Sequence, residues 1–214
     1  MSARGWNHNL HYHPLLLDAL PAHCRRALDV GCGEGTLARA LRRRVDHVTA
    51  IDADERSIDL ARRQDAGSEI DYLLGDFMTF PLPGASFDFI ACVAALHHME
   101  PVAALQRMRD LLAPNGVLAV LGLARSRPLD LPRDLAATVV SRAHRLTKRE
   151  WHSPAPTIWP PPHTYAEIRR LAECTLPSAR YERHLLFRYS IMWRAGSPSP
   201  PAPIPRRPPA EARR

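Results

Sequence analysis

A glycine-rich turn with an acid in front of it is the first feature of the chain that could do chemistry. Residues 29–35 read Asp-Val-Gly-Cys-Gly-Glu-Gly, directly after a short apolar run. Gly31 and Gly33 permit positive φ angles and let a ligand approach bare backbone. A turn that serves packing alone would use the same residues, so the turn indicates a ligand site without specifying the ligand.

The spacing of the glycines separates two classes of ligand. In the dinucleotide pattern G-x-G-x-x-G, counted from Gly31, the third glycine falls at position 36, but the chain has Thr36 there and Gly35 before it. A bound pyrophosphate has no use for the Asp29 carboxylate, whereas S-adenosylmethionine carries an ammonium and a sulfonium cation that a carboxylate favours. The turn therefore favours adenosylmethionine, and a site for NAD(P) is the alternative.

Two further acids close the next two apolar runs. Asp52 ends "HVTAID", about 20 residues past the glycines, where a carboxylate can accept hydrogen bonds from ribose hydroxyls. Asp54 fits the N-cap of the following helix better, which leaves Asp52 free for a ligand. Asp76 can accept from an adenine amino group, and the ring of Phe77 can lie against the base. Ligands bind at the carboxyl ends of strands in open α/β sheets, so we expect these acids at one edge.

A fourth apolar run leads into "VAALHHM". Val93 and the two alanines after it are small enough to border the methionine part of the cofactor. His97 and His98 follow, and an imidazole with an ordinary pKa of about 6.5 can take a proton from a methyl acceptor. The alternative is that one histidine packs in the loop and the other faces solvent. Both interpretations are open at this point.

These residues need a scaffold that brings strand ends together, and the pattern of the chain predicts one. Near-continuous apolar runs alternate with helix-like segments, which predicts a parallel sheet covered on both faces. Two strand-like runs within 179–194 predict an antiparallel hairpin at the sheet edge. The expected fold is α/β, Rossmann-like and doubly wound, with a mostly parallel seven-stranded sheet. Before the hairpin, the strands are expected at 26–31, 47–52, 70–76, 87–92 and 116–123, and helices at 35–44, 55–64 and 101–114.

Two segments outside this pattern are expected to cover the site. Residues 5–21 predict a helix over the cofactor with Tyr12 lining the site, and a surface-packed helix is the alternative. Residues 130–150 predict an amphipathic helix with Leu135 and Val139 on its buried face. We expect the stretch 124–163 that contains this helix to form a lid over the acceptor.

Composition limits the classes of protein. The chain has 214 residues, 45% apolar and 24% charged, which suits one domain over 1–195. Residues 196–214 are rich in Pro and Arg and predict a disordered tail, with a weak protein ligand as the less favoured interpretation. The net charge is +7, and the tail contributes four arginines and one glutamate, so 7 − 3 leaves +4 for the body. That charge is too small to indicate nucleic-acid binding by itself.

The cellular location and the absence of a bound metal are predicted from features that the sequence does not contain. No apolar run is long enough for a signal sequence or a membrane span, so we expect a cytoplasmic protein. The four cysteines form no CxxC pair, which argues against disulfides and a zinc site. No acid cluster for Mg²⁺ stands out, and no metal is expected.

From about Arg26 to Leu123 the sequence resembles the class I (Rossmann-like) S-adenosylmethionine-dependent methyltransferases, in particular the small-molecule branch related to the ubiquinone and menaquinone biosynthesis enzymes. The resemblance implies adenosylmethionine as cofactor and in-line methyl transfer to an O, N or C atom of a small molecule. An oxidoreductase and a non-catalytic module of the same fold are the alternatives. The residues that carry the match or flank it in the expected cofactor site are Asp29, Gly31, Cys32, Gly33, Gly35, Asp52, Ala53, Asp76 and Phe77, followed by Leu96-His97-His98-Met99.

Overall fold

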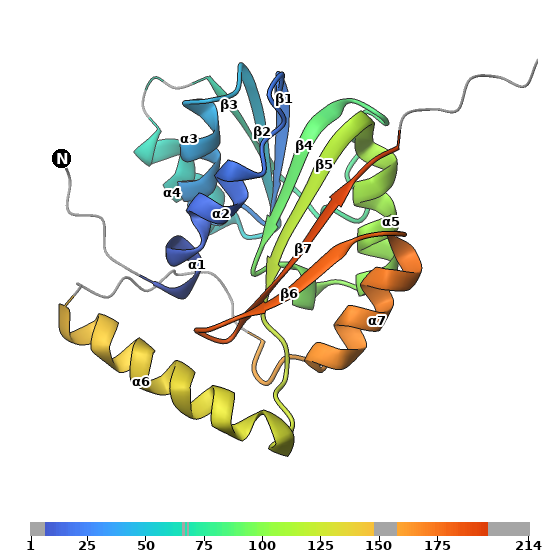
Figure 1. Ribbon diagram of the computed structural model, residues 1–214. Helices are drawn as coiled ribbons and strands as arrows, with labels where there is room; N and C mark the ends of the chain where they lie inside the picture. The colour runs from blue at the N-terminus through green and yellow to red at the C-terminus, as the bar shows by residue number, and fades with distance from the viewer. Residues whose placement is uncertain (1–6, 66, 68, 148–157, 197–214) are drawn as a thin grey trace, which may run out of the picture.

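A single mixed sheet organises the chain. The computed structural model describes residues 7–65, 67, 69–147 and 158–196 (Figure 1). Seven strands lie in the order β3-β2-β1-β4-β5-β7-β6, with β7 antiparallel to both neighbours and every other pair parallel. The predicted α/β fold with an antiparallel C-terminal hairpin is confirmed. The strands are β1 (Arg26–Val30), β2 (His47–Asp52), β3 (Ile70–Leu74), β4 (Phe87–Val93), β5 (Leu112–Gly122), β6 (Arg180–His184) and β7 (Arg188–Arg194).

Helices cover both faces of the sheet, as the apolar strands require. One face packs against α2 (His13–Asp18), α3 (Thr36–Arg42) and α4 (Glu55–Gln64), whose buried side chains include Leu16, Leu41 and Ile58. The other face packs against α5 (Pro101–Leu111) and α7 (Tyr165–Thr175) through side chains such as Met108 and Ile168. Loops at the carboxyl ends of the parallel strands are therefore left open to bind a ligand.

Helix α5 ends three residues earlier than the sequence predicts. It begins after Glu100, whose carboxylate accepts from the backbone N–H groups of Val102 and Ala103 at 3.0 and 2.6 Å. It ends at Leu111, because Leu112 already has extended backbone and pairs with Phe87 of β4. A short passage with Pro114 then leads into the main run of β5, since the residue before a proline disfavours helix.

The N-terminal segment forms two short helices where the sequence predicts one. These are α1 (His8–His11) and α2, and they meet at Tyr12, whose backbone N–H donates to the carbonyl of Asn9 at 3.0 Å. Pro14 stands in the first turn of α2, where its missing N–H costs no hydrogen bond. The break lets α1 turn toward the hairpin of β6 and β7 (Figure 1).

Helix α6 (Leu131–Thr147) forms where predicted, but the predicted buried face is wrong. Leu135 and Val139 are 59% and 69% exposed, whereas Ala137 and Ser141 are buried. Figure 1 shows α6 standing apart from the sheet, below the hairpin. Its anchors are polar: His8 Nε2 lies 2.9 Å from Ser141 Oγ. The helical period determines which side chains lie on the same face of α6, but the segments that pack against the helix determine which face is buried.

Three expectations stay as predictions. The tail predicted at 196–214 lies outside the described residues apart from Gly196, and so do residues 148–157 of the predicted lid. Within the described part of the chain, no helix combines the length and apolar character needed to cross a membrane. The cytoplasmic location stays a prediction.

Candidate active site

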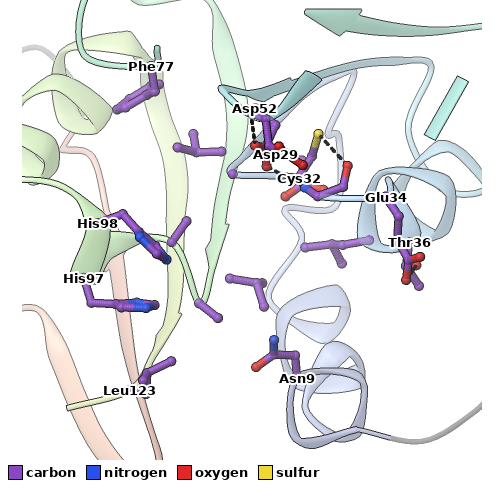
Figure 2. A pocket seen from close by; sticks show the side chains of 18 of the residues that line it. Asn9, Asp29, Cys32, Glu34, Thr36, Asp52, Phe77, His97, His98 and Leu123 are labelled. Carbon is purple, nitrogen blue, oxygen red and sulfur yellow. Dashed lines mark hydrogen bonds between the residues drawn. The ribbon is translucent and has the colours of Figure 1, made fainter. Parts of the chain in front are cut away.

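A cavity of about 730 Å³ opens at the carboxyl ends of the parallel strands. Its wall is built from the turn after β1, the loops after β2, β3 and β4, helix α1, and the start of β7. Figure 2 shows part of this lining. Of the residues predicted to bind the cofactor or to act as a base, all except Tyr12 and Gly35 line the cavity. They are Asp29, Gly31, Cys32, Gly33, Asp52, Ala53, Asp76, Phe77, Val93, His97 and His98.

Asp29 is the most buried acid of the site. Its side chain is 1% exposed, and its Oδ2 atom has no hydrogen-bond partner among the described residues. Burial, together with the charge of Asp52, raises the pKa of the Asp29 carboxyl to about 7. A buried carboxylate is costly without a positive partner. The site therefore fits a ligand that brings a cation to Asp29.

The glycine turn leaves backbone facing the cavity. Ile51 of β2 accepts from the N–H groups of Gly31 and Cys32 at 2.8 and 3.1 Å, which fixes the turn against the neighbouring strand. A Cβ on Gly31 would lie 2.2 Å from the Cβ of Ala95, so the loop after β4 can approach only a glycine. Gly33 has φ +52°, and a Cβ there would meet nothing within 4 Å. Close approach of a ligand to this backbone is therefore possible.

Asp52 ties the second strand to the same turn. Its Oδ2 accepts from the backbone N–H of Gly33 at 2.8 Å, and its Oδ1 accepts from that of Asp54 at 2.9 Å. Asp54 caps α4 by accepting from the N–H of Ser57, which confirms the predicted cap. Each oxygen of Asp52 has one backbone partner, so the carboxylate is held in place and is not wholly free. Its remaining lone pairs can accept from ligand hydroxyls.

Asp76 and Phe77 border the cavity after β3. Asp76 Oδ1 accepts from the backbone N–H of Met78 at 2.9 Å, which holds its turn. Phe77 is buried, and the guanidinium of Arg107 lies 5.3 Å from its ring centroid. Arg107 Nε also donates to the carbonyl of Phe77 at 2.7 Å. A fixed aromatic ring beside a carboxylate can hold a flat base that carries an amino group.

His97 and His98 enter the cavity from the loop after β4, on the side opposite Glu34 and Thr36 (Figure 2). Their ring centroids lie 4.1 Å apart. His97 is 9% exposed, and its Nδ1 is buried without a hydrogen-bond partner in the described part of the chain. Burial, with the charges of His98 and Arg188, lowers the pKa of His97 to about 4. Burial also lowers the pKa of His98, so both rings are neutral at pH 7.

Two of the singled-out residues lie elsewhere. The hydroxyl of Tyr12 donates to the carbonyl of Leu185 at 2.6 Å, and its ring centroid lies 5.1 Å from that of His184. Tyr12 thus anchors α1 to the β6–β7 hairpin and is not part of the cavity lining. Gly35 is also outside the lining, and a Cβ on it would lie 2.5 Å from Tyr72 Oη.

The cavity also contains residues that the sequence did not single out. Asn9 reaches it from α1, Leu123 from the end of β5, and Phe187 and Arg188 from the start of β7. Nothing in the local pattern distinguishes Arg188 from the surface arginines of this basic chain. Only the register of β7 against β5, with Tyr189 opposite Gly122, brings it to the edge where the parallel strands end.

One reversed strand, β7, stands in an otherwise parallel seven-stranded sheet, and a glycine turn and acids at the strand ends line the cavity. These features define a Rossmann-like protein of the class I methyltransferase type. A family model described as "Methyltransferase domain" matches residues 28–120. An uncharacterized methyltransferase of Mycobacterium tuberculosis is 39% identical over 191 residues, covering 89% of this chain and 97% of the relative. The chain therefore belongs to the S-adenosylmethionine-dependent methyltransferase family.

More distant likenesses are consistent with this. A ubiquinone biosynthesis O-methyltransferase of Xylella fastidiosa is 37% identical over 123 residues, or 53% of this chain and 50% of the relative. The crystal structure of the N-methyltransferase NodS from Bradyrhizobium japonicum, in complex with S-adenosylhomocysteine, has a TM-score of 0.58 and 17% identity. The match covers 89% of this chain and 87% of that chain. This last likeness is one of fold.

Proposed function

We propose that this protein transfers the methyl group of S-adenosylmethionine to an O, N or C atom of a small-molecule acceptor by in-line displacement. The observation that carries the proposal is one cavity that combines acids and bare glycine backbone with neutral histidines. The first set suits a cationic nucleoside. The second set suits an acceptor that must be positioned and, for some acceptors, deprotonated.

Each part of the cofactor has candidate partners on this chain. Asp29 would pair with the ammonium group, beside the backbone of Gly31 and Gly33. Asp52 would accept from the ribose hydroxyls, and Asp76 with the ring of Phe77 would hold the adenine. Cys32, Ala53 and Val93 would complete the walls around it. The orphaned oxygen of buried Asp29 and the open space at Gly33 support this assignment.

The bound cofactor supplies a methyl group on a good sulfonium leaving group. The work left to the protein is to hold the acceptor atom in line and to exclude water. Both rings, of His97 and His98, are neutral near pH 7. A general base works best with a pKa near the operating pH, and the pKa of about 4 makes His97 a weak proton acceptor. His98 is therefore the candidate that takes a proton from an acceptor hydroxyl or amine, and His97 the one that positions the acceptor. Acceptors that carry no such proton need only positioning.

The segment 124–163 would cover the acceptor end of the cavity. Leu123, just before it, and Trp159 within it line the cavity, and the Trp159 side chain is 73% exposed. A large aromatic side chain at the rim can close over a bound acceptor. The similar proteins include an O-methyltransferase and an N-methyltransferase, so the proposal covers both kinds of receiving atom.

The direct test is calorimetric titration of the purified protein with adenosylmethionine and adenosylhomocysteine, followed by transfer of a labelled methyl group to small molecules of a fractionated extract. Wild type should bind both ligands, and Gly33→Arg should lose them. Asp71→Ala, at an exposed acid of β3 outside the cavity lining, should bind like wild type. A folded protein that binds neither ligand contradicts the proposal, and enhanced NADH fluorescence in that sample would support the oxidoreductase alternative.

A further inference from the structure

Arg188 lines the cavity wall on β7, well along the sheet from the acids Asp29 and Asp52. It begins β7, and the register of the hairpin pairs it with His184. Two strands, β4 and β5, separate β7 from β1, which ends just after Asp29. Neighbouring strands lie about 4.8 Å apart, so three steps across the sheet span about 14 Å. Arg188 therefore belongs to the end of the cavity away from the proposed cofactor acids.

The guanidinium of Arg188 is held in place by neutral groups. Nε donates to Asn9 Oδ1 at 2.9 Å, and Nη1 faces the carbonyls of Leu186 and Phe187 at 3.4 and 3.2 Å. Nη2 has no hydrogen-bond partner among the residues that the structure describes. The Arg188 guanidinium is thus fixed through Nε and Nη1, and the N–H donors of Nη2 are left for a ligand.

Its charge has no counter-ion within the described part of the protein. No carboxylate there lies within 4.0 Å of Arg188, although burial lowers its pKa to about 10, which leaves it charged at neutral pH. Arg183, on β6 of the same hairpin, differs in this respect, because Asp130 Oδ1 lies 2.5 Å from its Nη1. A partly buried cation without an anion is costly, and an anionic ligand would offset that cost.

The two ends of the cavity therefore carry opposite charge. Asp29 and Asp52 stand at one end, and Arg188 stands at the other beside the apolar side chains of Leu123 and Phe187. The charge of Arg188 also contributes to the lowered pKa of His97, so this cation acts on the space that His97 faces. A cavity polarised in this way suits a cation at the first end and an anion at the second.

We infer that Arg188 binds a carboxylate of the methyl acceptor, so that the substrate class of this enzyme is carboxylic acids with an apolar portion. The inference rests on the proposed methyl transfer and adds the acceptor's charge to it. A planar carboxylate matches the free donors of a guanidinium better than a neutral amide does, because the amide lacks the charge and one of the two acceptor oxygens.

The test compares acids with their primary amides. Three acids and their amides are titrated into the protein, and binding is followed by NMR. The pairs are acetate and acetamide, hexanoate and hexanamide, and benzoate and benzamide. Each titration is done with and without adenosylhomocysteine. Wild type saturated with adenosylhomocysteine, whose own carboxylate is then already bound, should bind at least one acid about tenfold or more tightly than its amide. Arg188→Met should reduce this preference to less than about twofold, and Arg188→Lys should keep part of it.

Arg194→Met is the matched control, since Arg194 ends the same strand and donates to the carbonyl of Asn115 away from the cavity. It should keep the wild-type preference. If Arg188→Met does not fold, Arg188→Gln, which retains a donor toward Asn9, replaces it. Equal binding of acids and amides by wild type, or a preference that survives loss of Arg188, overturns the inference. An acid preference that disappears when adenosylhomocysteine is bound assigns Arg188 to the cofactor's own carboxylate and also overturns the inference. Failure of wild type to bind adenosylhomocysteine counts against the proposed function instead.

Discussion

The backbone N–H of Gly33 donates to the Asp52 carboxylate at 2.8 Å, which joins the glycine turn after β1 to the acid that ends β2. One acid therefore does two things: it fixes the shape of the turn and presents its remaining lone pairs to the cavity. Any change at Asp52 alters both the ligand contact and the backbone that frames it.

Replacing Asp52 should weaken cofactor binding more than it weakens the fold. A hydrogen bond to a charged group contributes about 1.5–3 kcal/mol, so Asp52→Ala should lower adenosylhomocysteine affinity by roughly tenfold to a hundredfold. Asp52→Asn keeps one acceptor oxygen and should lose less. Calorimetric titration measures both variants, with Asp71→Ala as the control. Unchanged affinity in Asp52→Ala would remove this residue from the proposed site.

Two glycines of the turn should respond differently to alanine. At Gly33 the Cβ enters open space at the cavity, so Gly33→Ala should weaken adenosylhomocysteine binding at least about tenfold. Its backbone strain costs about 1–2 kcal/mol of stability. At Gly35 the Cβ would lie 2.5 Å from Tyr72 Oη, so overpacking adds roughly 1–3 kcal/mol there. Urea unfolding should show the larger loss of stability in Gly35→Ala, and calorimetry should show the larger loss of affinity in Gly33→Ala. The reverse result would contradict the placement of Gly33 at the ligand.

The raised pKa of Asp29 makes the stability of the ligand-free protein depend on pH. The folded state holds this proton up to about pH 7, whereas the unfolded chain releases it near 3.8. The contribution of Asp29 to the free energy of unfolding therefore falls as pH rises from 3.8 to about 7, by up to about 1.4 kcal/mol per pH unit. Asp29→Asn removes this dependence. Urea unfolding from pH 5 to 8 should show the variant gaining on wild type as pH rises, and a constant difference argues against a protonated Asp29.

The effect of His97 on stability has the opposite pH dependence to that of Asp29, over an overlapping pH range. Its pKa in the folded state is lowered to about 4, so the unfolded chain takes up the proton first as pH falls from 6.5. The contribution of His97 to stability is present above 6.5 and is lost as pH falls toward 4. His97→Asn should therefore lose less stability in acid than wild type does, measured by urea unfolding between pH 4.5 and 7. A wild-type His97 ring that titrates near 6.5 by NMR is incompatible with this expectation.

The exposed stripe of α6 should tolerate polar substitution. Leu135→Ser and Val139→Ser should each change the free energy of unfolding by less than about 0.5 kcal/mol, as for other surface sites. Ala137→Arg places a long charged side chain at a position that is 2% exposed and should cost roughly 1–3 kcal/mol. Urea unfolding of the three variants distinguishes the two faces. Large losses at Leu135 and Val139 would show that something covers this stripe in solution.

Much of the candidate site could be predicted because its residues follow strands directly in the chain. Asp29, Asp52 and Asp76 each stand at or just past the end of an apolar run, and parallel strands end at the same edge of a sheet. The residues that the sequence missed or misplaced lie on segments without that constraint. Tyr12 stands at a break between two helices, and its hydroxyl turns to Leu185 of the hairpin. Local pattern contains no information about such a partner.

By itself the sequence determined the order of strands and helices and the set of acids and glycines at the strand ends, because hydrophobic period and turn residues act over a few neighbours. Only the tertiary structure decided which distant segments meet. Asn9 and Arg188 are 179 residues apart, yet their side chains share a hydrogen bond at the cavity. Which face of α6 is buried was likewise decided by the segments that pack against it. Contacts of this kind depend on hairpin register and helix docking, which are set by packing across the whole sheet.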